Sequence, residues 1–337
     1  MSMTPSSSLN KVRVALATMA SVLILGCTPA EDAEQAVIEQ PLVPIKVSGS
    51  YWIELSPVIV AANSFYPQQM TVGEGGITTI TSGAADLATN AETQLLRETV
   101  TNNPDLRIIM TVTESFYRLV GRRSAGIETL ADLKGKRVML PRNTSANYYL
   151  VAMLRTVGLT EDDVEIVNLP AAQGDQTGMD LMSDALANGD VDVISIWEPE
   201  PEDAIHQLGD DAIVFQDRSV YREVFNLHAR AGDLADPEKR RSIVEFVRSV
   251  ADATEALKAD PAPYWPHVSS ITSFTVEEIG MGWPEMEFPV HIIPDMLDVL
   301  VEEEPWVAKL QNRAPRSRAE LEIFIDRSVV EEALSSR

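Results

Sequence analysis

Two hydrophobic patterns alternate along most of the chain. Short apolar runs such as Val191–Ile196 follow stretches such as Ser145–Val157, in which apolar residues recur every three or four positions. The first pattern predicts buried strands and the second predicts amphipathic helices, so their alternation indicates an α/β protein. Strands are predicted at 45–49, 69–72, 85–89, 107–111, 118–121, 137–140, 164–168, 191–196, 212–215 and 223–229. Helices are predicted at 56–63, 76–82, 92–99, 145–157, 178–188, 200–208, 237–258, 276–281, 294–303 and 318–322.

The predicted elements divide unevenly between two domains. The segment from about Thr113 to His228 contains both strands and helices, whereas the C-terminal third is helical and needs a sheet to pack on. We therefore expect a discontinuous first lobe, 45–112 plus 229–337, and an inserted second lobe, 113–228. Each lobe should be a mainly parallel sheet flanked by helices, with a ligand cleft between the lobes where the strands end.

The N-terminus has the pattern of an export signal. Lys11 and Arg13 precede an apolar run over 14–26, which is too short for a permanent membrane span. The sequence Ile24-Leu25-Gly26-Cys27 resembles a bacterial lipobox, so residues 1–26 are predicted to be a lipoprotein signal peptide and Cys27 the lipidation site. An ordinary cleaved signal with an unrelated cysteine is the alternative. Residues 27–44 are polar and acidic and predict a flexible tether.

Charge and residue types narrow the function further. Removing residues 1–26 would take the formal net charge from −24 to −26, and the sequence has no Lys/Arg cluster, which argues against nucleic acid and against membrane contact other than through the anchor. Cys27 is the only cysteine, and the four histidines lack metal-ligand spacing. We therefore expect a protein that is not an enzyme, with no catalytic residues, metal or cofactor. A monomer is also expected.

Three ordered motifs carry a family resemblance. The segments Leu130–Leu140 and Pro141–Tyr149 are similar to a D-L-K-G-K-[KR]-V signature and the G-[ST]-S-A-x motif that follows it, and Gly189–Pro199 resembles a G-x-[VI]-D-A-x-x-x-W-[DE]-P block. Together they resemble the substrate-binding lipoproteins of bacterial ABC importers, of the nitrate/sulfonate/taurine type. These proteins are related to binding proteins for thiamine-pyrimidine precursors. The resemblance implies a two-lobed type II periplasmic-binding-protein fold.

The resemblance also implies second-lobe residues that face the solute. The turn and helix start at Asn143, Thr144, Ser145, Ala146 and Asn147 would offer backbone N–H groups and a positive helix dipole to an anion. Alternatively, Thr144 or Ser145 simply caps the helix.

The third motif would place an aromatic wall and an acceptor at the cleft. Trp197 is expected to supply the wall and Glu198 the acceptor. Their alternatives are a core tryptophan and a helix-start charge.

First-lobe candidates rest on weaker matches. Ser82–Thr93 resembles a family segment whose end faces the cleft, which implies contacts from Thr89, Asn90, Ala91 and Glu92. Tyr51 and Trp52 follow the first strand and would lie against the solute. Alternatively, they would form a hydrophobic staple, an apolar contact at the N-terminus of the next helix.

These expectations converge on a transport function. The protein would be exported and anchored on the extracytoplasmic side, would capture a small organic anion such as a taurine-like sulfonate by hinge closure, and would deliver it to an ABC permease and its ATPase. A heteroaromatic solute, either a thiamine-precursor pyrimidine or a flavin, is the alternative ligand. A lipoprotein partner of a membrane sensor and an enzyme of the pyrimidine-forming branch are further alternatives.

Overall fold

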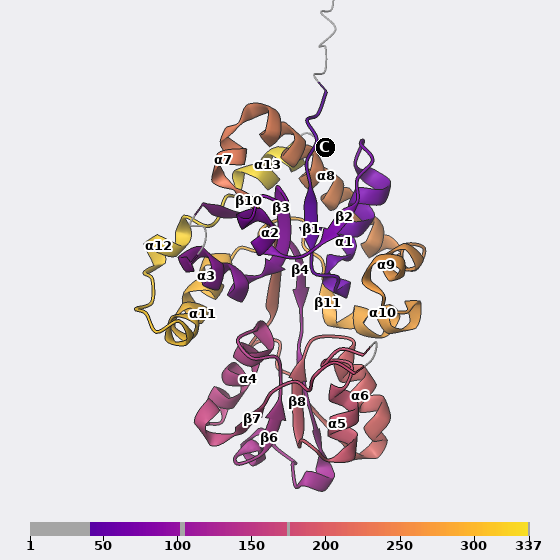
Figure 1. Cartoon of the computed structure of the whole chain (residues 1–337), viewed down its shortest axis with the longest axis vertical. Coiled ribbons are helices and arrows are strands. Elements are labelled where there is room, and N and C mark those ends of the chain that lie inside the picture. Colours follow the sequence, from indigo (N-terminus) through magenta and orange to yellow (C-terminus); the bar gives the residue numbers. More distant parts are fainter. Residues whose placement is uncertain (1–40, 102–104, 174–175, 336–337) are drawn as a thin grey trace, which may run out of the picture. The chain divides into compact units, whose positions relative to one another are not determined.

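The computed structural model describes residues 41–101, 105–173 and 176–335 (Figure 1). Its strands are β1 Val47–Gly49, β2 Val72–Glu74, β3 Leu87–Ala91, β4 Leu106–Ser115, β5 Arg118–Arg122, β6 Arg137–Met139, β7 Glu165–Val167, β8 Val193–Ile196, β9 Ala212–Phe215, β10 Glu223–Arg230 and β11 Met286–Glu287. Its α-helices are α1 Ser56–Val60, α2 Ile77–Thr81, α3 Glu92–Thr101, α4 Ser145–Thr156, α5 Met182–Asn188, α6 Glu200–Leu208, α7 Ala231–Ala235, α8 Pro237–Ala259, α9 Trp265–Thr272, α10 Val276–Gly282, α11 Met296–Leu310, α12 Arg318–Glu322 and α13 Ser328–Ser335.

The strands form two sheets. One has the order β11-β4-β10-β3-β1-β2 and the other has the order β7-β6-β8-β5-β9. We call the first sheet with its helices the first lobe, and the second sheet with its helices the second lobe. The chain passes from the first sheet to the second between β4 and β5 and returns between β9 and β10.

Both sheets are mixed, which corrects the expectation of mainly parallel sheets. In the first lobe β1 is parallel to β2 and β3, but β10 is antiparallel to β3 and β4. In the second lobe β6 is parallel to β7 and β8, whereas β5 is antiparallel to β8 and β9. The reason is topological: β4 leads toward the second lobe and β10 leads back, so two strands that lie side by side run in opposite directions.

The helices that follow β10 pack on the elements of the first lobe. The long helix α8 contacts α1 and α13, and α11 contacts α3. Asp236 caps α8 by accepting hydrogen bonds from the backbone N–H groups of Glu238 and Lys239, and Pro237 occupies the first turn. The C-terminal third therefore finds the apolar surface that its helices need.

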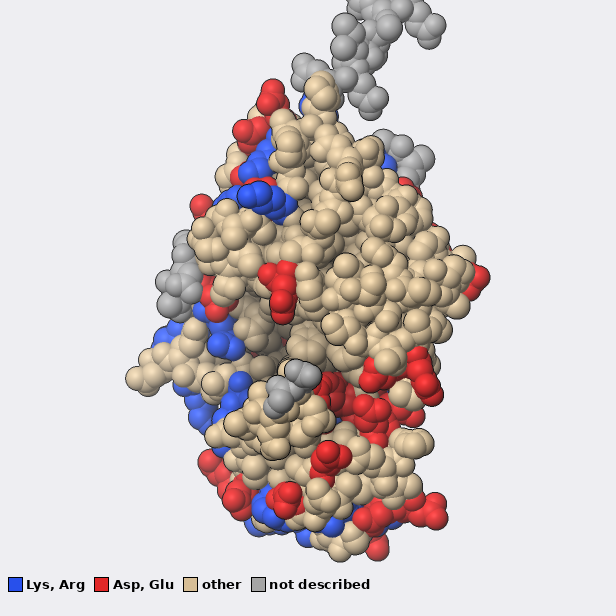
Figure 2. Space-filling model, turned by 45° about the vertical axis from the view of Figure 1, so that its right-hand side comes forward, with Lys and Arg blue, Asp and Glu red and all other residues tan. Residues whose placement is uncertain are grey.

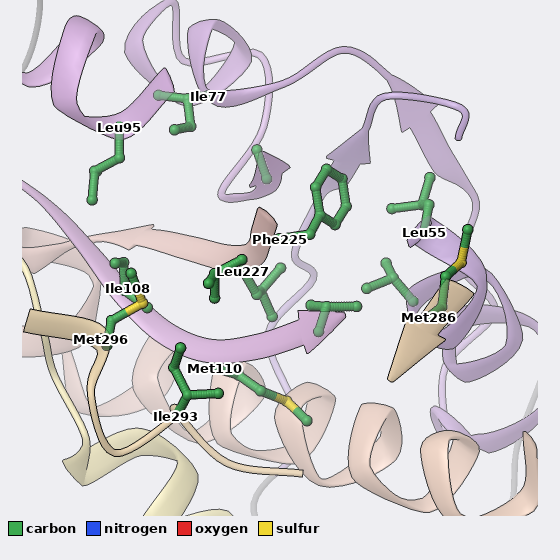
Figure 3. Close-up of a cluster of buried hydrophobic side chains, with 14 of the residues drawn as sticks. Leu55, Ile77, Leu95, Ile108, Met110, Phe225, Leu227, Met286, Ile293 and Met296 are labelled. Carbon is green, nitrogen blue, oxygen red and sulfur yellow. The ribbon is translucent and has the colours of Figure 1, made fainter. Parts of the chain in front are cut away.

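The first-lobe core surrounds the paired strands β4 and β10. Figure 3 shows Ile108 and Met110 from β4 near Leu227 from β10, with Ile293 and Met296 from the C-terminal segment nearby. All of these side chains are buried. Because β4 and β10 also lead between the lobes, this core fixes the strand ends from which the site is built.

Some predictions fall outside the described residues. The signal peptide 1–26, Cys27 and most of the tether 27–44 lie there, and residues 41–46 are in neither helix nor strand. Among the described helices, none combines the length and apolarity of a membrane span. On the face drawn in Figure 2, acidic and basic side chains are interspersed, and acidic ones gather near its middle.

Candidate functional site

A cavity of about 230 Å³ lies between the two lobes where strands of both sheets end. The first lobe lines it from the β1 end, β3, α3 and β10, and the second lobe lines it from the α4 start and the β8 end. Tyr117, which stands between β4 and β5, joins the two sides. The lining residues are Ser50, Trp52, Glu54, Asn90, Ala91, Gln94, Tyr117, Thr144, Ser145, Trp197, Glu223 and Phe225.

Aromatic side chains from both lobes meet at this cavity. The rings of Trp52 and Trp197 are 5.3 Å apart between centroids and meet edge to face. Tyr117 lies 6.0 Å from Trp197, and Phe274 extends the group at 6.2 Å from Trp52. Aromatic faces in a partly enclosed space favour flat apolar solutes and cations, since the π faces carry partial negative charge.

The start of α4 reaches the cavity, as its motif predicts. Thr144 is the N-cap residue in an extended conformation, but its hydroxyl donates to the carbonyl of Pro141 at 2.7 Å rather than to the helix. Ser145 donates its hydroxyl to Glu223 at 3.1 Å and lies 2.9 Å from the hydroxyl of Tyr117. Both hydroxyl groups therefore already have protein partners, and only the first backbone amides of α4 stay available to an anion by helix geometry.

Two buried carboxyl groups line the same cavity. Glu54 is 2% exposed, and burial raises its pKa to about 7 against hydrogen bonds from its own backbone and from Ser115. Burial raises the pKa of Glu223 well above its ordinary value, and the nearby charges of Glu54 and Glu92 raise it further. Among the described lining residues there is no Lys, Arg or His. The cavity is therefore acidic and aromatic.

The structure brings together six of the thirteen residues predicted to contact the solute: Trp52, Asn90, Ala91, Thr144, Ser145 and Trp197. Three first-lobe candidates lie outside the lining. Tyr51 donates its hydroxyl to the carbonyl of Val72 at 3.0 Å, and Thr89 is fully buried. Glu92 accepts from the Tyr221 hydroxyl at 2.8 Å and from the backbone N–H of Val224 at 2.7 Å, so both of its oxygens are engaged within the first lobe.

Four second-lobe candidates also lie outside the lining. Asn143 adopts a left-handed φ of 61°, and its carbonyl accepts from Arg97 of the first lobe at 2.6 Å. Ala146 is fully buried, and Asn147 is buried with its amide donating to Glu161 at 2.8 Å. Glu198 is 1% exposed and pairs with Arg118 at 2.6 Å. These residues shape the second lobe's side of the cavity without lining it.

Six lining residues were not anticipated from the sequence: Ser50, Glu54, Gln94, Tyr117, Glu223 and Phe225. A signal existed for two of them. Glu54 and Glu223 are single acidic residues beside strongly apolar neighbours, Ile53 and Leu55 in one case and Val224 and Phe225 in the other. A charged residue in such a run must be buried or face a cavity, and burial without a partner is costly.

A larger groove of about 620 Å³ lies on the first lobe beside β11. Trp283 and Phe288 stack there with centroids 4.7 Å apart. Its Arg222 is already paired with Glu114 and Asp295. Because only one lobe lines it, the groove is a weaker candidate for solute capture.

In the part of the chain that the structure describes, no group of three or more His, Cys, Asp or Glu side chains is placed to hold a metal ion.

Two mixed sheets with a cavity between their strand ends define the class of periplasmic-binding-protein folds. The structure is similar to the periplasmic aliphatic sulphonate binding protein SsuA from Escherichia coli, with a TM-score of 0.69 and 14% identity over 87% of this chain and 100% of that one. It is also similar to a C27S mutant of DSZB in complex with biphenyl-2-sulfinic acid, with a TM-score of 0.61 and 14% identity over 87% of this chain and 99% of that one. DSZB is a desulfurization enzyme, so the fold is shared by binding proteins and an enzyme. The predicted α/β periplasmic-binding-protein fold is confirmed, with mixed rather than mainly parallel sheets.

The chain belongs to the NMT1/THI5-like family, whose model matches residues 69–263, more than half of its length. A Haemophilus influenzae protein named for thiamine biosynthesis is 28% identical over 109 residues. That match covers 32% of this chain and 32% of the relative, so it spans about a third of the curated relative's length. The predicted resemblance to sulfonate-binding and thiamine-precursor proteins is confirmed at the level of family and fold.

Proposed function

We propose that this protein is the solute-binding component of an ABC importer and that it captures a flat heteroaromatic solute between its lobes. The observation that carries the proposal is the 230 Å³ cavity in which Trp52 of the first lobe and Trp197 of the second lobe lie 5.3 Å apart. A solute between the lobes would contact both, so it would favour the closed form by its differential affinity. The family, with its link to thiamine biosynthesis, supports the same class of solute.

The cavity favours the heteroaromatic alternative over the sulfonate expected from the motifs. A sulfonate would have to approach two carboxyl groups, Glu54 and Glu223, with no described Lys, Arg or His in the lining. Any ionised carboxyl group there would repel a sulfonate, and no basic side chain in the described lining would offset that repulsion. The fold of the E. coli sulphonate-binding protein and the α4 start in the lining support an anion, and for this reason sulfonates belong in the test.

Close approach of the lobes supports capture by closure. Arg97 donates to the carbonyl of Asn143 across the lobes at 2.6 Å. Gly282 of the first lobe lies so near the second that a Cβ there would be 2.9 Å from the Cβ of Glu198. A glycine at this point allows a contact that any side chain would obstruct.

The export and delivery steps complete the proposal. The signal peptide 1–26 and the lipobox ending at Cys27 would place the protein on the extracytoplasmic side, anchored by lipid, with an ABC permease and its ATPase as partners. We also propose binding rather than catalysis, since Cys27 is the only cysteine in the sequence and would be taken by the anchor.

A ligand screen by thermal shift tests this function. We expect 4-amino-5-hydroxymethyl-2-methylpyrimidine or riboflavin to raise the melting temperature, because a ligand at about a hundredfold its Kd adds about 2.7 kcal/mol of stability. Taurine and methanesulfonate should have little effect. Trp197→Ala should weaken binding of the active compound by about 10-fold to 100-fold, since an aromatic contact is lost.

Trp283→Ala is the matched control, because Trp283 lies against Phe288 and does not line the cavity. It should retain the affinity of the parent protein. Stabilisation by taurine with no response to either ring compound would contradict the heteroaromatic proposal.

A further inference from the structure

One residue that lines the cavity has a buried oxygen atom without a hydrogen-bond partner in the described chain. Oε1 of Glu54 accepts from the Ser115 hydroxyl at 3.2 Å, but the buried Oε2 has no hydrogen-bond partner within the described chain. The backbone of Glu54 is fixed because its carbonyl accepts from the Thr113 hydroxyl at 2.8 Å. A desolvated carboxyl oxygen on a residue that lines a cavity is an acceptor for a donor from outside the chain.

The second carboxyl of the cavity is arranged differently. Glu223 accepts from Ser145 at 3.1 Å, and Ser145 also lies beside Tyr117. Burial raises the pKa of Glu223 well above its ordinary value, and it raises the pKa of Glu54 to about 7. Of the two groups, only Glu54 has a buried oxygen that lacks a hydrogen-bond partner in the described chain.

Arg118 at the start of the second lobe has acidic partners other than the two carboxyl groups of the cavity. Arg118 is committed to Glu198 at 2.6 Å and to Glu202 at 2.8 Å. Within the described lining itself there is no basic side chain. A buried carboxylate without a cation is costly, so the cost is recovered if the bound solute brings the positive charge.

We propose that the solute is an aromatic cation whose charged N–H group donates to Glu54, making Glu54 the residue that selects solutes by charge. This inference rests on the proposed function and adds the charge of the solute to it. Trp52 and Trp197 then act on the same molecule, because aromatic faces attract a cation that is partly desolvated. Glu223 completes the site as a second polar group, which accepts from Ser145.

Three benzene derivatives that differ in net charge test the proposal: benzamidine (+1), benzamide (0) and benzenesulfonate (−1). Their affinities for the whole protein would be measured by isothermal titration calorimetry at pH 7.5 and low salt. We expect benzamidine to bind at least about 10-fold more tightly than benzamide, as a charge-assisted hydrogen bond in a buried site requires. Benzenesulfonate should bind more weakly than either.

Two variants assign the preference to one carboxyl group. Glu54→Gln keeps the shape and removes the charge, so it should abolish the preference for benzamidine over benzamide. Glu74→Gln is the matched control, since it changes the net charge equally at an exposed position in β2. It should leave the preference unchanged. Melting curves of both variants would establish that they fold.

Each contrary outcome overturns the proposal. Equal binding of benzamidine and benzamide, tighter binding of benzenesulfonate, absence of benzamidine binding at millimolar concentration, or a preference retained in folded Glu54→Gln would each do so. The proposed function would survive such results if a neutral ring compound still binds and Trp197→Ala weakens it. It would itself fail if aliphatic sulfonates bind and no ring compound does.

Discussion

The corner of the first lobe around Glu304 and the cavity around Glu54 bury carboxyl groups to the same degree, with exposures of 1% and 2%. Two cations, Arg313 and Arg316, pair with the carboxyl group of Glu304 on α11. The guanidinium nitrogens Nη2 and Nε of Arg316 donate to its two oxygens at 2.8 and 3.0 Å. Burial works to raise the pKa of Glu304, but hydrogen bonds from Arg316 and Arg313 hold it below its ordinary value. Around Glu54 the described lining has no cation, and the pKa rises.

The comparison separates a carboxylate that holds the fold together from one that is left for a ligand. Glu304 ties α11 to the segment before α12, and Arg316 also donates to the carbonyl of Leu96 in α3 at 2.8 Å. Glu54 instead keeps a buried oxygen without a partner in the described chain. Two carboxyl groups that are equally buried therefore have different roles. Arginine partners within the chain distinguish the structural group from the one left for a ligand.

The largest effect is expected at Glu304. Glu304→Ala leaves the guanidinium groups of Arg313 and Arg316 without their carboxylate, so the free energy of unfolding should fall by about 3–5 kcal/mol. Urea denaturation of the variant and the parent measures the loss. A change below about 1 kcal/mol would show that the two arginines find other acceptors, and the distinction drawn above would not hold.

A smaller, pH-dependent effect is expected at Glu200, which starts α6 and is 5% exposed. Burial raises its pKa from 4.5 to about 8, with Asp180, Glu198 and Asp203 adding to the rise. The folded state thus binds this proton more tightly than the unfolded state, so stability falls as pH rises from about 4.5 to about 8. Glu198, with a pKa of about 7, acts in the same direction.

Glu200→Gln removes that dependence at one position. At pH 8 the variant should be more stable than the parent by about 1–3 kcal/mol, while at pH 4.5 the two should be nearly equal. Melting temperatures recorded across this pH range provide the measurement. A constant difference at all pH values would mean that packing, and not the charge, is responsible.

The smallest effect is expected at the surface pair of Arg318 and Asp298, whose side chains are 56% and 66% exposed. Water already solvates both groups, so Arg318→Ala should change the free energy of unfolding by only about 0–1 kcal/mol. Urea denaturation of this variant gives the effect of an exposed ion pair, with which the effect at Glu304 is compared. If Arg318→Ala lowered the free energy of unfolding as much as Glu304→Ala does, burial of the ion pair would not determine the size of the effect.

Local pattern was enough to predict most elements of the fold. The predicted bounds of β9, α6 and α12 agree with the structure, since each is bounded by clear local signals such as Pro199 before α6 and Ser317 before α12. The strand predicted at 107–111 extends over Leu106–Ser115, because it pairs with β10 and β11 from far along the chain. The helix predicted to end at residue 303 continues past Pro305 to Leu310.

The continuation of α11 has a packing reason. Trp306, Val307 and Ala308 are buried, and Trp306 lies 5.4 Å from Tyr148 of the second lobe. The burial of these side chains outweighs the hydrogen bond that Pro305 cannot make. A single sequence does not reveal that the partner surface exists.

The site was predictable only in part, for a similar reason. The motifs located Thr144, Ser145 and Trp197, because their spacing is local. Glu54 and Glu223 are 169 positions apart in the numbering and meet only because β10 returns beside β3 and β4. The acidic character of the cavity, which decides the class of solute that we propose, is therefore a property of the assembled sheet.

The double passage of the chain between the sheets has a consequence for how this architecture can change. The chain enters the second lobe near residue 118 and leaves it near residue 215. These two points are neighbours, since Leu119 of β5 pairs with Phe215 of β9. The second lobe is therefore an inserted domain whose two ends lie side by side. Exchanging it for the corresponding segment of a relative would replace Trp197 and the α4 start together while leaving Glu54 in place, so ring recognition and charge selection could be recombined independently.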